Sequence, residues 1–219
     1  MFLKNYIPNV NKKFRNITFS GIAFESSKVK KNDIFFAIKG KNFDGNNYID
    51  DAIENGAKII ISEKKLFKKR SNLLFLFYPN VRKLLAEISY KILYKKPKKL
   101  VAVTGTNGKS SISDFYYQIL NLNSKKVASI GTIGLRYKNQ KIPLVNTTAD
   151  PIQLSSILHK LWKKKIEFVI MEASSHGLEQ NRLDGLTFDL GIFTNLSHDH
   201  LDYHKNMKKY FNSKLYLFE

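Results

Sequence analysis

Hydrophobic residues along the chain form short uninterrupted runs that alternate with stretches where they recur at helical spacing. The runs predict buried strands at 33–40, 58–62, 73–78, 100–105, 168–174 and 189–196, and a strand with a following loop at 126–134. The helical spacing predicts helices at 46–57, 81–93, 111–123 and 151–165, the last with Pro151 near its start. Strands that alternate with helices indicate an α/β protein with a mostly parallel sheet.

A short charged stretch divides these elements into two series. It is the sequence YKKPKKL at 94–100, which combines lysines with a proline. Such a polar segment is typical of a boundary between domains. We therefore predict two α/β domains, 1–97 and 98–219, a division that suits a chain of 219 residues.

The formal net charge of +19 raises the question of a nucleic-acid partner. Nearly all the cationic side chains are lysines, and arginine, the side chain expected for bidentate phosphate and base contacts, is scarce: it occurs at Arg15, Arg70, Arg82, Arg136 and Arg182. The lysines are scattered rather than gathered into a stripe. Lys, Asn, Ile, Phe and Tyr all have AT-rich codons, so genome composition explains the charge. We expect no nucleic-acid partner.

The composition also bears on location. A hydrophobic content of 43% predicts a folded globular protein. No apolar run approaches the roughly 20 residues that a membrane helix needs, and the N-terminus does not resemble a signal peptide. The chain contains no cysteine, which excludes disulfides and thiolate zinc sites. We expect a cytoplasmic protein without a membrane partner.

The sequence VAVTGTNGKS at 101–110 has the ending of a phosphate-binding loop, although the usual first glycine is replaced by Val103. A strand is predicted before it and a helix after it. In that setting backbone N–H groups and the helix dipole hold phosphate oxygens. Gly105 and Gly108 allow the bends, Lys109 supplies a charge for the β- and γ-phosphates, and Ser110 supplies a hydroxyl for Mg²⁺. The alternative is a plain strand-turn-helix with an exposed lysine.

Acidic and imidazole side chains follow two other predicted strands. Glu172 lies near the end of 168–174, and His198, Asp199, His200, Asp202 and His204 come just after 189–196. Ligands of open α/β sheets bind at the carboxyl ends of the strands, and such groups can hold the Mg²⁺ of a nucleotide. Alternatively, the aspartates cap a helix predicted at 203–218 and His198 and His204 are solvated. Together with the phosphate loop, the pattern favours a metal role for Glu172 and at least one histidine.

The motifs TGTNGKSS, NTTADP, MEASSHGLEQNR, FTNLSHDHLDYH and YFNSKLYLF occur in this order. Together they resemble the Mur ligase superfamily of ATP-dependent amide-forming enzymes, and within it the MurE group, the UDP-N-acetylmuramoyl-dipeptide ligases. The family's phosphate loop is the short form G-T-N-G-K-[ST], so Val103 is not a defect. The resemblance implies a uridine-nucleotide-binding domain followed by an incomplete P-loop-type central ATPase domain, with the C-terminal ligase domain absent.

The resemblance also implies site residues. ATP would be bound by Gly105, Thr106, Asn107, Gly108, Lys109, Ser110 and Ser111. The muramoyl-peptide substrate would be bound by Ser26, Asn146, Thr147, Thr148, Ser174, Gln180 and Arg182. Mg²⁺ would be held by Ser110, Glu172, His200 and a carbamylated Lys214, and catalysis would depend on Lys109, Lys214, Glu172 and His200. The family's D-S-R pattern reads Glu25-Ser26-Ser27 here, which weakens the uridine contact.

The implied reaction is ATP-driven amide formation with Mg²⁺, between UDP-N-acetylmuramoyl-dipeptide and a diamino acid, meso-diaminopimelate or L-lysine. A monomer is expected, and these 219 residues alone are expected not to complete the ligation. Two alternatives stay open: another amide ligase, such as MurF or folylpolyglutamate synthetase, or a nucleotide-binding remnant without catalysis. The motifs NTTADP and SSHGLEQNR favour the MurE group.

Overall fold

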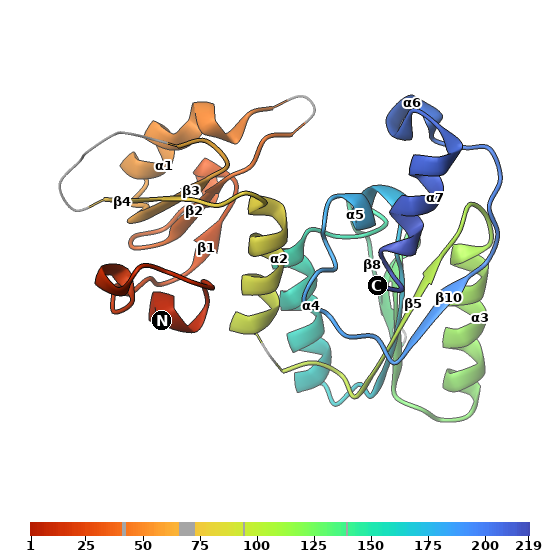
Figure 1. The fold of residues 1–219 in the computed structure, drawn as a ribbon. Coiled ribbons are helices and arrows are strands. Elements are labelled where there is room, and N and C mark those ends of the chain that lie inside the picture. The colour runs from red at the N-terminus through yellow and green to blue at the C-terminus, as the bar shows by residue number, and fades with distance from the viewer. Residues whose placement is uncertain (41–42, 66–72, 94, 139) are drawn as a thin grey trace. The chain divides into compact units, whose positions relative to one another are not determined.

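The computed structural model describes residues 1–40, 43–65, 73–93, 95–138 and 140–219. It divides into two compact units, Met1–Lys91 and Ile92–Glu219, which are described separately (Figure 1). The division falls near the end of helix α2 (Val81–Ile92). The sequence placed it a few residues later, between 97 and 98. Residue 94 of the predicted boundary lies outside the described residues.

The first unit is built on parallel strands. Among the described residues they are β1 (Ile22–Ala23), β2 (Ile34–Ala37), β3 (Ile59–Ser62) and β4 (Leu74–Phe77), which pair in that order. The helices are η1 (Leu3–Asn5), η2 (Lys12–Phe14), η3 (Ser26–Lys28), η4 (Gly45–Tyr48), α1 (Ile49–Glu54) and α2. β2, β3, β4 and α2 lie where the hydrophobic pattern predicted them.

One side of this sheet packs against α1. Phe35 of β2 and Ile60 of β3 share a buried cluster with Ile49 and Ala52 of α1. The predicted single helix over 46–57 is instead a 3-10 turn, η4, followed by the short α1. The Asp44 carboxylate accepts a hydrogen bond from Asn46 N at 2.9 Å and caps η4. A hydrogen bond from the Asn46 side chain, together with this one from the Asn46 backbone, lowers the pKa of Asp44 to about 2.

The second unit holds a larger sheet. Among the described residues its strands are ordered β10 (Leu190–Phe193), β5 (Lys99–Thr104), β9 (Phe168–Glu172), β6 (Val127–Gly131), β7 (Gly134–Tyr137) and β8 (Gln140–Ile142). The first four in this order are parallel, and β7 and β8 are antiparallel to their neighbours. The helices are α3 (Lys109–Leu122), α4 (Pro151–Lys163), α5 (Ser175–Glu179), α6 (Leu201–His204) and α7 (Met207–Leu215). The predicted α/β class with a mostly parallel sheet is confirmed.

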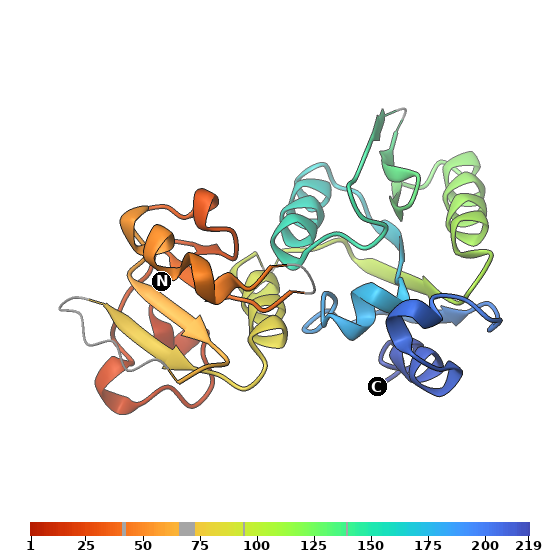
Figure 2. The same cartoon turned by 90° about the horizontal axis from the view of Figure 1, so that it is seen from above.

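Helices α3 and α4 lie on opposite sides of this sheet (Figures 1 and 2). On the α3 side, Val101, Val103 and Ile170 form a buried cluster against Ile112 and Tyr116. Helix α4 begins as the sequence predicted, with proline in its first turn. The Asp150 carboxylate accepts a hydrogen bond from Gln153 N at 2.9 Å, and so caps the helix.

Two local features differ from the sequence prediction. The hairpin of β7 and β8 was not predicted, because β8 is exposed along its length and lacks an apolar pattern. The helix predicted at 203–218 is divided between α6 and α7. Lys205 between them has φ of +70°, which an L-residue in a helix cannot adopt, and the Asn206 side chain caps α7.

A substitution at Ile170 tests the core of the second unit. Ile170 is fully buried in β9. Ile170→Ala should lower the free energy of unfolding by about 2–5 kcal/mol, because it removes buried atoms and leaves a cavity, whereas Ile170→Val should cost about 0.5–1.5 kcal/mol. Urea unfolding can be followed by the fluorescence of the single tryptophan, Trp162 in α4. Equal midpoints for the two variants would contradict this packing.

Candidate functional site

The parallel strands of the second unit bring four chain segments to one edge of the sheet. In the ladder, Val103 of β5 pairs with Glu172 of β9, and Thr104 pairs with Phe193 of β10. The loop after β5, the end of β9, the turn after β6 and the segment after β10 therefore meet, as expected at the carboxyl ends of parallel strands. This convergence builds the candidate site.

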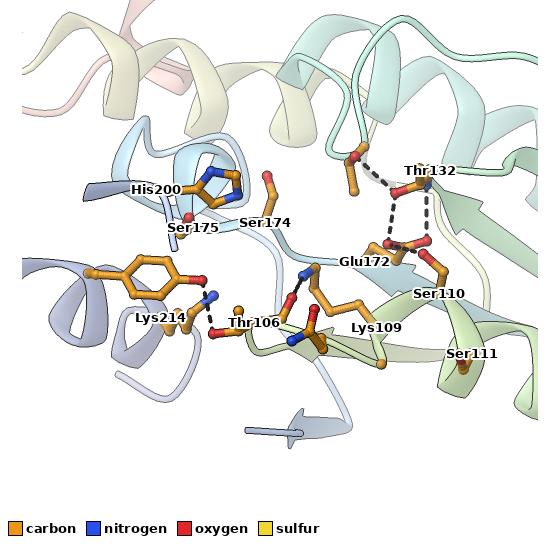
Figure 3. Close-up of a pocket in the computed structure, with 14 residues that line it drawn as sticks. Thr106, Lys109, Ser110, Ser111, Thr132, Glu172, Ser174, Ser175, His200 and Lys214 are labelled. Carbon is orange, nitrogen blue, oxygen red and sulfur yellow. Dashed lines mark hydrogen bonds between the residues drawn. The ribbon is translucent and has the colours of Figure 1, made fainter. Parts of the chain in front are cut away.

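A cavity of about 290 Å³ lies at this edge (Figure 3). It is lined by Thr106, Asn107, Gly108, Lys109, Ser110, Ser111, Thr132, Thr147, Glu172, Ser174, Ser175, His200, Tyr210 and Lys214. The side chains are mostly polar or charged, and they come from segments far apart in the sequence. The predicted phosphate loop, Glu172, His200 and Lys214 thus share one cavity.

The loop between β5 and α3 has the backbone that its glycines predict. Gly105 has φ of +142° and Gly108 has φ of +82°, and α3 starts directly after Gly108, at Lys109. Val103 is fully buried in β5, before the loop begins. The turn therefore starts at Gly105, and the position of the missing glycine belongs to the core.

The segment after β10 supports this loop. The Thr194 hydroxyl donates to Asn107 O at 2.6 Å, the Asn195 side chain accepts from Asn107 N at 3.0 Å, and Thr106 N donates to Asn195 O at 2.9 Å. A Cβ atom on Gly105 would lie 1.9 Å from Thr194 Oγ1, so only glycine fits there. The sequence did not single out Thr194 or Asn195, which it placed within the strand predicted at 189–196; the observed β10 ends before them, at Phe193.

The Glu172 carboxylate is the buried acidic group of the cavity, with 2% of the residue exposed. It accepts hydrogen bonds from the Ser110 hydroxyl (3.0 Å), from Thr132 N (3.0 Å) and from the Thr132 hydroxyl (3.0 Å), as Figure 3 shows. A Cβ atom on Gly131 would lie 2.1 Å from Glu172 Oε1. The phosphate loop and the acidic group are thus in direct contact.

Two lysine ammonium groups donate to the same loop carbonyl. Lys109 Nζ lies 2.9 Å from Gly105 O, and Lys214 Nζ lies 2.7 Å from it. Lys214 is only 1% exposed and its Nζ lies 4.3 Å from the centre of the Tyr210 ring. Burial, with the nearby charge of Lys109, lowers the pKa of Lys214 to about 8; burial also lowers the pKa of Lys109, against the opposing charge of Glu172.

Lys214 thus stands apart from the many surface lysines. A lysine whose pKa is lowered to about 8 has a larger neutral fraction at neutral pH than an exposed lysine, and the neutral amine is the nucleophilic form. The sequence could not distinguish it by composition, because lysines are abundant throughout the chain. Its burial under Tyr210, on α7, depends on the tertiary structure.

His200 lines the same cavity from the start of α6. Its backbone is left-handed, with φ of +52°, and its Nε2 lies 3.5 Å from Asp199 Oδ2. Asp199 also accepts from His200 N at 2.8 Å, so this aspartate orients His200 and caps no helix in the structure. In the described part of the chain, no three acidic or imidazole residues cluster closely enough to hold a metal by themselves.

A second histidine, His204, is fully buried beside the cavity. Its Nε2 lies 3.0 Å from Ser175 Oγ and its Nδ1 lies 2.9 Å from Glu179 Oε2. Burial lowers the pKa of His204 to about 4, and the neighbouring side chain of His176 adds to this effect. His204 is therefore neutral at pH 7, and it joins α5 to α6. The expectation that His204 could be solvated is wrong.

The residues expected to bind the muramoyl-peptide lie at different places. Thr147 and Ser174 line the cavity, and the buried Thr148 hydroxyl donates to Glu172 O at 2.9 Å. Arg182 donates to Thr148 O and to the Gln180 side chain. Asn146 is exposed and lies outside the cavity lining. Ser26 belongs to the first unit, in η3, where its carbonyl accepts from the Asn55 side chain.

Comparison with known families agrees with this geometry. Residues 103–219 match the family described as the Mur ligase middle domain, and residues 18–90 match the Mur ligase family, catalytic domain. The chain belongs to the Mur ligase family. The resemblance inferred from its five motifs is thereby confirmed.

Curated relatives of this Mur ligase chain include the UDP-N-acetylmuramoyl-L-alanyl-D-glutamate–2,6-diaminopimelate ligases of Fusobacterium nucleatum and Rickettsia typhi. The first is 44% identical over 91% of this chain and 41% of the relative, and the second is 42% identical over 96% of this chain and 43% of the relative. This chain therefore spans less than half the length of these relatives.

Solved structures give the same picture. A structure of a UDP-N-acetylmuramoyl-L-alanyl-D-glutamate–2,6-diaminopimelate ligase matches with a TM-score of 0.84 and 32% identity, over 99% of this chain and 44% of that one. A MurF ligase from Thermotoga maritima matches with a TM-score of 0.59 and 23% identity, over 90% of this chain and 42% of that one. The MurF likeness shows a common fold alone.

The buried His204 gives a test by pH. Because its pKa lies near 4 in the fold against an ordinary 6.5, the unfolded chain binds more protons between these values, and stability falls as the pH falls through this window. We expect the wild-type chain to lose about 2 kcal/mol of unfolding free energy through His204 between pH 7 and pH 5. His204→Gln should lose correspondingly less unfolding free energy over the same pH range. Parallel urea-midpoint profiles for the wild type and His204→Gln would contradict the assignment.

Proposed function

We propose that the cavity of the second unit binds the phosphates of ATP together with Mg²⁺. The observation that carries the proposal is the contact of Ser110 with Glu172, beside Lys109, at the start of α3. Backbone N–H groups at the start of a helix and a lysine ammonium group can both bind phosphate oxygens. A carboxylate next to a hydroxyl suits the magnesium that accompanies them.

The donor set of the cavity fits magnesium. Mg²⁺ prefers oxygen ligands and is usually held by one or two protein carboxylates together with phosphates and water. Glu172 and Ser110 offer oxygens 3.0 Å apart, and His200 lines the same cavity. When bound, Mg²⁺ would neutralise phosphate charge during phosphoryl transfer. Lys214, if carbamylated, would add a further anionic group to this side of the cavity.

We propose further that the chain is part of an ATP-dependent amide ligase of peptidoglycan precursor synthesis. Its relatives are named for UDP-N-acetylmuramoyl-L-alanyl-D-glutamate and 2,6-diaminopimelate. In the proposed reaction, a substrate carboxylate takes the γ-phosphoryl group of ATP, which gives an acyl phosphate and ADP. The amine of the diamino acid then attacks the acyl carbon, and phosphate leaves.

The chain's own residues would bind and orient the reactants. Lys109 and the loop amides would hold the phosphates in place, which is the main contribution a protein makes to phosphoryl transfer. Thr147 and Ser174, which line the cavity, would face the acyl acceptor. The buried Thr148, which is hydrogen-bonded to Ser174 and Arg182, would complete this substrate-binding group together with Arg182 and Gln180. Ser26 and the exposed Asn146 would contact other parts of the substrate. We also propose that the protein acts as a monomer.

We place the reaction in the cytoplasm, where ATP and nucleotide-linked sugars are available. Along the described residues, no helix is long and apolar enough to cross a bilayer. The 2,6-diaminopimelate named for the relatives favours this amino acid over L-lysine as the diamino acid.

Calorimetric titration with ATP and Mg²⁺ tests the proposal. Lys109→Met should weaken binding about 10- to 100-fold, because a hydrogen bond to a charged group contributes about 1.5–3 kcal/mol. Lys141→Met, at an exposed lysine of β8, is the matched control and should bind as the wild type does. A wild-type chain that binds no magnesium nucleotide would overturn the proposal.

The substrate is tested by the release of ADP. The wild-type chain should release ADP faster when UDP-N-acetylmuramoyl-L-alanyl-D-glutamate is added than with UDP-N-acetylglucosamine, which lacks the acceptor carboxylate. Equal rates with both compounds would count against carboxylate activation while leaving nucleotide binding intact.

A further inference from the structure

Thr132 is a residue of the cavity to which the sequence assigned no role. It follows β6 directly and precedes β7, so it lies in a turn between two paired strands. Its backbone N–H donates to Glu172 Oε1, and its hydroxyl donates to Glu172 Oε2, each at 3.0 Å. In Figure 3 the Glu172 carboxylate lies between Thr132 on one side and Ser110 on the other. Thr132 therefore contacts both carboxylate oxygens.

The Thr132 hydroxyl also touches Thr147, at 3.0 Å between the two Oγ1 atoms. A threonine hydroxyl has one proton and two acceptor lone pairs. Since the Thr132 proton is directed to Glu172, the proton between the two threonines must come from Thr147. The hydrogen bonds therefore run in one direction, from Thr147 to Thr132 to Glu172.

The turn that carries Thr132 is fixed by its surroundings. Gly131 and Gly134 pair across the turn, and Gly134 has φ of +99°. A Cβ atom added to Gly134 would lie 2.4 Å from Ile142 O, so only glycine fits there. Arg136 of β7 forms an ion pair with Asp114 of α3, the helix that also carries Ser110. The two segments that donate to Glu172 are thus linked to each other.

We propose that Thr132 is a positioning residue for the Glu172 carboxylate, and that the Thr147–Thr132–Glu172 chain couples the acyl-acceptor side of the cavity to the magnesium side. This rests on the proposed function. Because the Thr147 hydroxyl donates its proton to Thr132, Thr147 offers only lone pairs to a ligand. The substrate group that meets Thr147 is therefore an N–H or O–H donor, and not a phosphate or carboxylate oxygen.

Coupling between the two ligands follows from the direction of these hydrogen bonds. A donor that binds to Thr147 Oγ1 polarises the hydrogen bond to Thr132, which in turn strengthens the bond from Thr132 to Glu172. A metal ion at Glu172 acts on the same bonds from the other end. By linkage, each ligand changes the affinity for the other by the same factor.

The test uses Thr132→Val, which removes the hydroxyl at nearly constant volume, and Thr132→Ser, which keeps it. The affinity for the non-hydrolysable analogue AMP-PNP is measured by calorimetry with Mg²⁺ and with EDTA. We expect Thr132→Val to reduce the gain in affinity due to Mg²⁺ about tenfold, the lower end of the range for partners of metal ligands. Thr132→Ser should restore it to within about threefold, and binding in EDTA should be alike in all three proteins.

The titrations are repeated with saturating UDP-N-acetylmuramoyl-L-alanyl-D-glutamate. The wild type should show a changed affinity for magnesium AMP-PNP, and Thr132→Val and Thr147→Val should lose that change. Thr147→Val leaves both bonds from Thr132 to Glu172 in place, so it separates coupling from positioning. If the wild type shows no coupling, or Thr132→Val keeps it, the inference is wrong.

A measurement without any ligand covers the case in which Thr132→Val does not fold. In the wild-type chain the Thr132 amide proton should resonate downfield, because it donates to a carboxylate, and Glu172→Gln should move it upfield. An unchanged resonance would overturn the positioning role. Failure of the wild type to bind magnesium AMP-PNP overturns the proposed function instead, so the two failures are distinguishable.

Discussion

The hydrogen bond between the Ser110 hydroxyl and the Glu172 carboxylate is the contact on which the site depends. It joins the first turn of α3 to the end of β9, and it can form only because β5 and β9 are parallel and adjacent, with Val103 opposite Glu172. A carboxylate that is almost fully buried requires such donors, since an uncompensated buried charge is costly. The same hydrogen bonds hold a carboxylate oxygen of Glu172 beside the phosphate loop, where a cation that accompanies phosphates would bind.

The surrounding glycines follow from this close packing. Gly105 approaches Thr194, and Gly131 approaches Glu172, at distances that leave no room for a Cβ atom. The segment after β10 then holds the phosphate loop through Asn107, and the turn after β6 holds Glu172 through Thr132. Each support comes from the end of a neighbouring strand, so the sheet order, and not the order along the chain, determines which residues meet.

Lys109, Lys214 and His204 show how burial lowers the pKa of residue types that are common in this chain or usually lie at the surface. Both lysines donate to Gly105 O; burial lowers the pKa of each, and the charge of Lys109 lowers the pKa of Lys214 further. His204 is kept neutral between α5 and α6 by the loss of solvent. Composition does not distinguish Lys214 among so many lysines; the family resemblance assigned it to the site, and the packing of α7 buries it in the cavity.

The hydrophobic pattern alone predicted the α/β class, the strands β2 to β6, β9 and β10, and the helices α2, α3 and α4, because a buried strand or an amphipathic helix leaves its period in the sequence. The motif with Gly105, Gly108 and Lys109 predicted the phosphate loop, since its backbone conformation is local. The pattern missed the exposed β8, the break at Lys205, and the roles of Thr132, Thr194 and Asn195. Those depend on which strand ends lie side by side, and pairing between distant segments is decided only by the tertiary structure.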